Sequence, residues 1–182
     1  EIDEASVPEG HKVLPTRMVR TLKNYDGVVY DPSDKVRENK AKKKSRFVVK
    51  GYAERDTHGT TYAAVPGSVS IKTVLTLCSK HNWSLKTADI STAFLHADIP
   101  DDQPVYVWPP QEHETKCNVG GRMKVWKLQK ALYGLKAAAR LWQLHLQKIL
   151  TEIGWKQCHS DRTIYLAPDG RGVMAVYVDD LL

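Results

Sequence analysis

The amino-acid sequence predicts an α+β fold, an antiparallel sheet with helices packed on one face. Helical periodicity marks two stretches, 70–81 and 130–153, and short β-branched or aromatic runs typical of strands lie before, between and after them. Strands and helices in this mixed order favour a sheet with its helices segregated to one side. The chain has 182 residues, 42% hydrophobic and 26% charged, so it can bury a core of ordinary size.

The first third of the chain predicts a basic hairpin. Residues 1–23 are polar and weakly patterned, and we expect a lead-in segment or a strand fragment there. Asp-Gly and Asp-Pro pairs within 24–35 indicate a turn region. The run 46–52 is rich in β-branched and aromatic residues and predicts a strand, which would pair with 28–30.

The rest of the chain predicts helices and strands that alternate and end in a hairpin. Apolar residues recur at i, i+3, i+4 and i+7 in the first helix, and one apolar stripe runs along the second until Gly154. A Pro-Asp-Gly turn joins the last two strands. The expected elements are a helix over 70–81, a strand over 83–91, a loop over 100–114, a helix over 130–153, and strands over 163–167 and 173–178.

Basic residues gather in one short window of the chain. The net charge is +6, yet the window 35–50 holds eight Lys and Arg residues against the single acid Glu38. A local basic patch points to a polyanionic partner more strongly than a diffuse excess does. A solvated charged hairpin is the plain alternative.

Three aspartates stand at the ends of expected strands. Asp89 ends one strand, and Asp179-Asp180 ends the last. If these strands are neighbours, three carboxylates converge, and they stay ionised together only with a cation between them. Such oxygen ligands suit Mg²⁺, and two such ions can stabilise a phosphoryl transfer. The alternatives are an Asp-Asp pair that merely caps a turn, and a ribonuclease H-like nuclease or integrase.

Ordered motifs make this sequence resemble the reverse transcriptase of copia-type long-terminal-repeat retrotransposons. The resemblance runs from about Lys44 to the C-terminus and implies reverse-transcriptase-type fingers plus a partial palm. It divides the chain into a lead-in and fingers-like hairpin over 1–66 and a partial palm over 67–182, with some fingers residues in the loop 98–128. The motifs are KSRFVVKGY at 44–52, DISTAFL at 89–95, LYGLK at 132–136, Leu141-Trp142, Ser160-Asp161 and YVDD at 177–180.

The resemblance implies an RNA-directed DNA polymerase that uses two Mg²⁺ ions, with Mn²⁺ as a substitute. A primer 3′-hydroxyl would attack the α-phosphorus of a dNTP on an RNA or DNA template. The implied catalytic residues and metal ligands are Asp89, Asp179 and Asp180, with the backbone carbonyl of Ile90 beside them.

The same resemblance implies residues that contact the nucleotide and the nucleic acid. An arginine fork suits the triphosphate, and an aromatic ring five residues after Asp89 would fill the space of a ribose 2′-hydroxyl. The implied dNTP-binding residues are Arg46, Lys44, Phe94, Gly134 and Lys136, with Gly134 close to the templating pair. The implied nucleic-acid-binding residues are Lys42, Lys43, Lys50 and Tyr177.

Departures from the family pattern leave a second hypothesis open. Ala137-Ala138-Ala139 stands where the family has Gln-Ala-Pro, and Lys72 replaces an arginine. The alanine stretch and the truncation after Leu182 favour a catalytically dead relic that only binds nucleic acid. We also expect the return strand after Asp180, the thumb and the ribonuclease H domain to be missing, so that this chain alone is inactive.

The ends and the cysteines indicate a part of a larger intracellular protein. The first residue is Glu1, no secretory signal follows it, and no apolar run approaches the roughly 18 residues of a membrane span. The three cysteines lack a CxxC spacing, which argues against disulfides and a zinc site. We therefore expect a piece of a Pol polyprotein with integrase and ribonuclease H, in a cytoplasmic particle or the nucleus, with no membrane partner.

Overall fold

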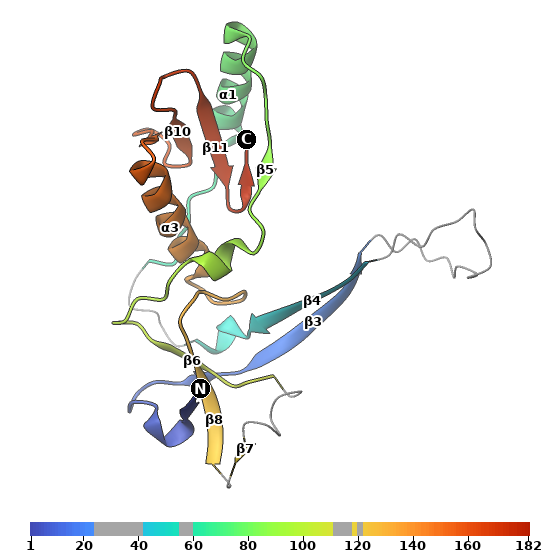
Figure 1. The fold of residues 1–182 in the computed structure, drawn as a ribbon, viewed down its shortest axis with the longest axis vertical. Coiled ribbons are helices and arrows are strands. Elements are labelled where there is room, and N and C mark those ends of the chain that lie inside the picture. The colour runs from blue at the N-terminus through green and yellow to red at the C-terminus, as the bar shows by residue number, and fades with distance from the viewer. Residues whose placement is uncertain (24–41, 55–59, 111–117, 120–121) are drawn as a thin grey trace, which may run out of the picture.

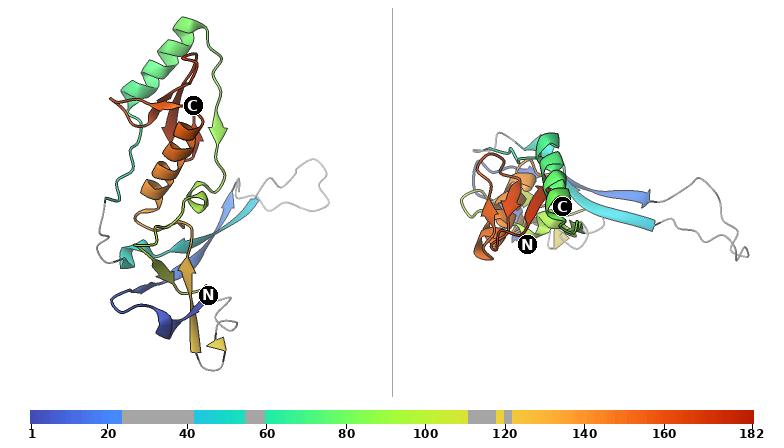
Figure 2. Two further views of the ribbon diagram at one scale, coloured as in Figure 1. Left: turned by 60° about the vertical axis from the view of Figure 1, so that its left-hand side comes forward. Right: turned by 90° about the horizontal axis from the view of Figure 1, so that it is seen from above.

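The structure, a computed structural model, describes residues 1–23, 42–54, 60–110, 118–119 and 122–182. The molecule is elongated, with a helix-containing upper lobe, a lower lobe that carries the N-terminus, and a two-stranded arm that projects sideways between them (Figures 1 and 2). No helix of the described residues has the length and apolar character to span a bilayer.

The upper lobe contains an antiparallel sheet and the two α-helices of the described chain. The predicted helix over 70–81 is confirmed, and so are the two strands of the last hairpin. The helices are α1 (Ser68–His81) and α3 (Ala138–Glu152). The strands, in spatial order, are β5 (Ala88–Asp89), β12 (Asp180–Leu181), β11 (Val173–Tyr177), β10 (Ile164–Leu166) and β9 (Lys156–Gln157).

The two helices pack on opposite faces of this sheet, so the prediction of helices on one face is wrong. Ile164 of β10 lies opposite Ala175 of β11, and both pack against Val74 of α1. The next pair, Tyr165 and Met174, points to the other face and packs in the core cluster of α3. Both faces of β10 and β11 are apolar, and each face is therefore stable only when a helix packs on it and excludes water. Helical periodicity locates a stripe on a helix but does not say which sheet face it meets.

The helix expected over 130–153 begins only at Ala138. Gly134 has φ +91°, and Leu135 donates a backbone hydrogen bond to Leu132, so a turn replaces the first two helical turns. An apolar pattern continues through this turn because Ala131, Leu132 and Leu135 are buried. The periodicity therefore extended beyond the helix itself.

A second sheet forms the lower lobe. The loop expected over 100–114 contains the strand β6, and its residues 111–114 lie outside the described chain. Val107 is fully buried although its strand has only three residues, too short to show a period. The strands are β1 (Ile2–Asp3), β8 (Arg122–Leu128), β6 (Val105–Val107) and β2 (Val13–Leu14) in this order, with β7 (Asn118–Val119) also on β8. The described residues also form the short 3-10 helices η1 (Glu4–Ser6), η2 (Gly51–Ala53) and η3 (Ala93–His96).

The arm is an antiparallel pair of β3 (Thr16–Lys23) and β4 (Lys42–Val49), in register from Thr16↔Val49 to Lys23↔Lys42. The strand expected over 46–52 is present only in part, because β4 ends at Val49 and η2 follows, and β4 pairs with β3. Residues 28–30, the turn region 24–35 and the part 35–41 of the basic window lie outside the described residues. The weak pattern of β3 arises because most of its side chains are not buried on either face.

Candidate active site

Two of the three predicted aspartates lie side by side in the upper sheet. β12 pairs with β11 on one side and with β5 on the other, so Tyr177, Asp180 and Asp89 form one cross-strand row. Directly opposite residues of an antiparallel sheet share a face. The strand β12 also corrects the expectation that the return strand of this hairpin is missing, because two residues are enough to pair on both sides.

The third aspartate lies in the tight turn of the same hairpin. Val178 and Asp179 connect β11 to β12, and Val178 has φ +57°. The Trp142 indole donates a 2.6 Å hydrogen bond to the Val178 carbonyl. The Ile90 amide donates a 2.8 Å hydrogen bond to the Asp179 carbonyl. Both carbonyls of the turn are thus held from outside the hairpin.

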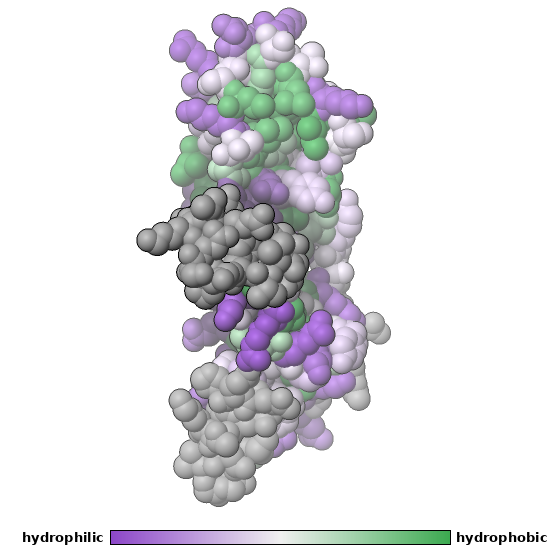
Figure 3. All heavy atoms as spheres, turned by 90° about the vertical axis from the view of Figure 1, so that its right-hand side faces the viewer, coloured by the Kyte–Doolittle hydropathy of each residue, from purple (hydrophilic) through white to green (hydrophobic). Residues whose placement is uncertain are grey.

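A cavity of about 350 Å³ opens beside the row of Tyr177, Asp180 and Asp89. Its other walls are apolar except for Thr87. Pro66 comes from the chain just before α1, and Ile71 comes from the first turn of that helix. Figure 3 shows hydrophobic residues gathered on this side of the upper lobe. The carboxylates therefore stand exposed at the rim of an apolar hollow.

The donor set of this hairpin fits a hard divalent cation, although it does not form a closed site. Among the described residues, no group of three or more His, Cys, Asp or Glu side chains is arranged to hold a metal ion. Asp89 and Asp180 share a face and are exposed, and Asp179 adjoins them. Mg²⁺ binds through one or two carboxylates with substrate phosphates completing its shell. The two-metal site remains a prediction.

The arm places its cations mostly on one face. Side chains alternate along a strand, so Lys42, Lys44 and Arg46 share a face with Val48. By register, Arg17 and Lys23 of β3 lie on the same face. The described arm strands contain no acidic residue. Lys43 lies on the other face, and Lys50 follows β4 with its amide bonded to Pro15.

The base of the arm meets the turn before α3 through two glycines. A Cβ on Gly134 would lie 2.0 Å from the Val49 carbonyl oxygen, and one on Gly51 would lie 1.9 Å from the Gly134 oxygen. The Val49 amide donates a 2.8 Å hydrogen bond to the Tyr133 carbonyl across the same contact. Close backbone approach explains why Gly134 is a glycine, whatever it contacts in a nucleotide complex.

Phe94 packs beside this glycine contact. It lies in η3, half-buried, with its ring edge-to-face against Tyr133 at a centroid distance of 5.2 Å. The Tyr133 carbonyl is the acceptor for β4, so a short path of contacts links Phe94 to the base of the arm. The side chain of Phe94 is thus neither fully exposed nor sealed in the core.

Lys136 is bound to Glu54 by two hydrogen bonds. Its amide donates to the Glu54 carboxylate at 2.8 Å, and its ammonium donates to the Glu54 carbonyl at 2.9 Å. An ammonium has three donors, so one contact leaves others for a phosphate. Sequence reasoning assigned Lys136 to the nucleotide and missed Glu54, because no pattern in the sequence links residues so far apart.

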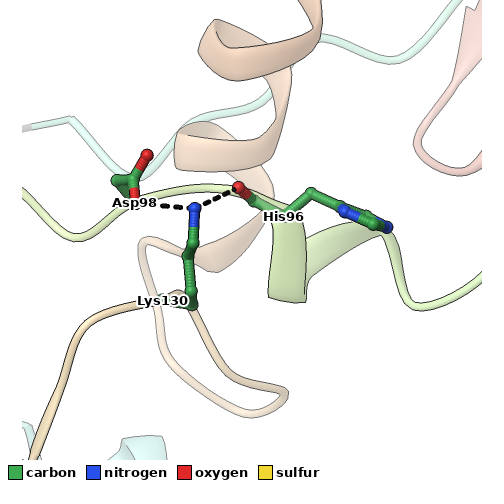
Figure 4. A network of polar contacts seen from close by, with 3 residues as sticks. All are labelled: His96, Asp98 and Lys130. Carbon is green, nitrogen blue, oxygen red and sulfur yellow. Dashed lines mark hydrogen bonds and ion pairs between the residues drawn. The ribbon is translucent and has the colours of Figure 1, made fainter.

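A polar network of His96, Asp98 and Lys130 lies where the chain enters the same turn (Figure 4). The Lys130 ammonium lies 2.7 Å from the Asp98 carboxylate and donates a 3.0 Å hydrogen bond to the His96 carbonyl. The hydrogen bond and charge of Lys130 lower the pKa of Asp98 below its ordinary value. This polar network holds the end of η3, which carries Phe94, against the segment before Leu132.

A second polar network links α1 to the segment just before β10. Ser70 donates to one oxygen of Asp161, and Thr163 donates to the other through its amide at 2.9 Å and its hydroxyl at 2.6 Å. Burial by itself raises the pKa of Asp161, but these hydrogen bonds outweigh it and lower the pKa. The Ser160-Asp161 motif therefore has a structural role, which its sequence alone did not show.

Trp142 is the main residue that sequence reasoning left without a role. The sequence places it in the apolar stripe of the helix and in the Leu141-Trp142 motif, and it is indeed buried at 3% exposure. Its contact with the turn cannot be inferred from periodicity, because a stripe says nothing about the hydrogen-bond partner of an indole.

Comparison with known proteins agrees with the motifs. The profile of the family described as "Reverse transcriptase (RNA-dependent DNA polymerase)" matches residues 3–182. The "Retrovirus-related Pol polyprotein from transposon RE1" of Arabidopsis thaliana is 36% identical over 143 residues, which cover 76% of this chain and 9% of that protein. Its counterpart from transposon TNT 1-94 of Nicotiana tabacum is 30% identical over 144 residues, 76% of this chain and 10% of that protein.

More distant relatives cover nearly the whole chain. The transposon Ty1-NL2 Gag-Pol polyprotein of Saccharomyces cerevisiae is 27% identical over 194 residues, 98% of this chain and 10% of that protein. No solved structure matches the chain. The chain spans about a tenth of the length of the curated relatives it matches. With a family profile along almost its full length and these Pol relatives, the chain belongs to the reverse transcriptase (RNA-dependent DNA polymerase) family, of the copia type that its motifs indicated.

Proposed function

We propose that this chain provides the nucleotidyl-transfer site of an RNA-directed DNA polymerase encoded by a copia-like element. In this reaction the primer 3′-hydroxyl attacks the α-phosphorus of a dNTP, a new phosphodiester bond forms, and pyrophosphate leaves. Positioning and electrostatic stabilisation supply most of the catalysis of such transfers.

The observation that carries the proposal is the row of Tyr177, Asp180 and Asp89 beside a cavity of about 350 Å³. Asp89, Asp179 and Asp180, with the Ile90 carbonyl, would hold divalent cations, Mg²⁺ or Mn²⁺. When bound, these ions neutralise the charge that develops on the phosphoryl oxygens. Tyr177 is 50% exposed at the end of the row and would contact the primer strand.

The arm supports a role in holding the nucleotide and the template. Lys42, Lys44 and Arg46 share one face, with Arg17 and Lys23 beside them. Arg46 and Lys44 would hold the triphosphate, and the outer lysines, together with Lys43 and Lys50, would contact phosphates of the nucleic acid. A phosphate-directed surface of this kind is read through backbone and shape, with weak sequence preference.

The nucleotide pocket would lie where the arm meets the turn before α3. Gly134 and Lys136 belong to this junction, and Phe94 packs beside it on Tyr133. In this proposal the Phe94 ring excludes a 2′-hydroxyl and so favours dNTPs over rNTPs.

The relatives support a role for this chain within a larger protein. RE1 and TNT 1-94 are Pol polyproteins, and this chain matches about a tenth of each. We propose that residues 1–66 act as fingers and residues 67–182 as palm of a Pol polyprotein. Its further parts would include integrase and ribonuclease H, and its RNA template would be copied inside the cell.

A relic that binds nucleic acid without turnover is the second candidate. Ala137, Ala138 and Ala139 replace the family's Gln-Ala-Pro at the start of α3, next to the proposed nucleotide pocket. An alanine offers no polar group to a nucleotide. The basic arm would remain, so binding would outlast catalysis.

A chimera tests the proposal and separates the two candidates. These residues replace the matching segment of the RE1 polyprotein, and extension of a DNA primer on an RNA template is measured with Mg²⁺ and dNTPs. We expect extension, its loss in Asp179→Asn, and little change in Asp101→Asn, an exposed loop aspartate used as the control. Extension that survives Asp179→Asn would refute the proposed site. Extension that appears only after Gln-Ala-Pro is restored at 137–139 would favour the relic.

A further inference from the structure

One buried tryptophan donates its indole proton to the turn that carries Asp179. Trp142 lies in α3 with 3% of its surface exposed, and its Nε1 donates a 2.6 Å hydrogen bond to the Val178 carbonyl. A buried indole N–H needs an acceptor, because leaving it unpaired costs its full desolvation. Here the acceptor is the backbone of the turn rather than a side chain.

The turn itself depends on outside support. A two-residue turn leaves its own carbonyls outside the ladder, and Val178 adopts φ +57°, which a β-branched residue disfavours. Trp142 binds the Val178 carbonyl, and the Ile90 amide binds the Asp179 carbonyl at 2.8 Å. The first bond comes from α3, on one face of the sheet, and the second comes from the chain just after β5.

We propose that Trp142 is a positioning residue, whose indole N–H sets the place of Asp179 and Asp180 relative to Asp89. This inference rests on the proposed function for its catalytic meaning. Without the hydrogen bond the turn relaxes away from α3, and the backbone contact between Asp179 and Ile90 loosens with it. Misplacement by about 1 Å at a reacting centre can cost on the order of a hundredfold in rate.

The test removes only the donor and watches the turn directly. Trp142 is replaced by Phe, and in a second protein by benzothienylalanine, which keeps the shape of the indole but carries sulfur in place of N–H. Amide hydrogen exchange of Ile90 reports the bond to the Asp179 carbonyl, and Mn²⁺ affinity, by water-proton relaxation, reports the carboxylates. The control is Trp155→Phe, the same change in the same core cluster beyond the other end of α3.

We expect both replacements at 142 to speed Ile90 exchange and weaken Mn²⁺ binding by about fivefold each, the effect of one lost hydrogen bond. The control should change neither quantity. Unchanged Ile90 exchange in the benzothienylalanine protein would overturn the proposal. This readout decides the question even if Trp142→Phe does not fold. Equal effects in Trp155→Phe would overturn it too, because core packing would then explain them. Absence of Mn²⁺ binding in the unaltered chain would contradict the proposed function alone, since Ile90 exchange would still decide the role of Trp142.

Discussion

Replacing Gly134 by alanine should destabilise the chain more than any surface change, because two penalties coincide at this position. Its φ is +91°, in the left-handed region, which costs an L-residue about 1–2 kcal/mol. Its new Cβ would lie 2.0 Å from the Val49 oxygen, where real Cβ atoms stay beyond 3.0 Å. The arm must therefore move away from the turn by about 1 Å, the difference between these two distances.

That movement breaks the 2.8 Å hydrogen bond from Val49 to Tyr133, which is worth about 1 kcal/mol. With the strain of about 1–2 kcal/mol, the loss of free energy of unfolding comes to about 2–3 kcal/mol. For a chain of this size each kcal/mol lowers Tm by about 2–4 °C, so we expect Tm to fall by about 4–12 °C.

A matched control separates the two penalties. Gly10 has φ +88°, but a Cβ there would meet nothing within 4 Å, so Gly10→Ala carries the strain alone. Gly51→Ala carries the clash alone, since its Cβ would lie 1.9 Å from the Gly134 oxygen at an ordinary φ. Thermal unfolding followed by circular dichroism should rank Gly10→Ala mildest, with a loss of about 2–8 °C in Tm from strain alone. Equal losses in Gly10→Ala and Gly134→Ala would refute the close contact between arm and turn.

Three further predictions concern charge, pH and nucleotide choice. Replacing the lysines at 42–44 by alanine should reduce the magnitude of the slope of log K against log[salt] by about 2, where K is the association constant for single-stranded nucleic acid. The same loss of charge at Lys80, Lys86 and Lys156 should leave the slope unchanged. The pKa of Asp161 is lowered from 3.8, so the ionised carboxylate stabilises the folded chain above that pH, and this stabilisation is lost as the pH falls below it. Asp161→Asn should therefore flatten the decline of the urea midpoint below about pH 4. An unchanged decline would contradict the stabilising role of the hydrogen bond between Ser70 and Asp161. In the RE1 chimera, Phe94→Ala should raise kcat/KM for rNTPs relative to dNTPs by about tenfold or more, and an unchanged ratio would show that Phe94 is only a packing residue.

Local patterns in the sequence predicted the elements that depend on local chemistry. The helix over 70–81 and the strands of the last hairpin follow from apolar period and turn residues, and both are present. These features need no knowledge of distant contacts. The carboxylates were expected to converge if the strands 83–91 and 173–178 are neighbours. Asp89 does lie opposite Asp180, but β5 pairs with the return strand β12, which separates it from β11.

Features that depend on tertiary contact could not be predicted in the same way. The helix boundary at Ala138 depends on the backbone of Gly134 meeting β4, and the pairing of β3 with β4 depends on register rather than on propensity. The two sheet faces were misjudged because α1 and α3 have stripes of the same kind. Glu54 and Trp142 act through backbone acceptors and donors, which no residue pattern encodes.

The central claim is that Asp89 and Asp179-Asp180 hold one divalent metal site. Fe²⁺ takes the place of Mg²⁺, and added hydrogen peroxide oxidises it to Fe³⁺ with release of hydroxide and a hydroxyl radical, while ascorbate reduces the iron again. The radicals cut the backbone next to the bound ion, and mass spectrometry of the fragments locates the cuts. The account predicts paired cuts near 89 and near 179–180, both suppressed by excess Mg²⁺ and both absent from Asp89→Asn. Cuts at only one of these segments, or cuts that persist in Asp89→Asn, would contradict it.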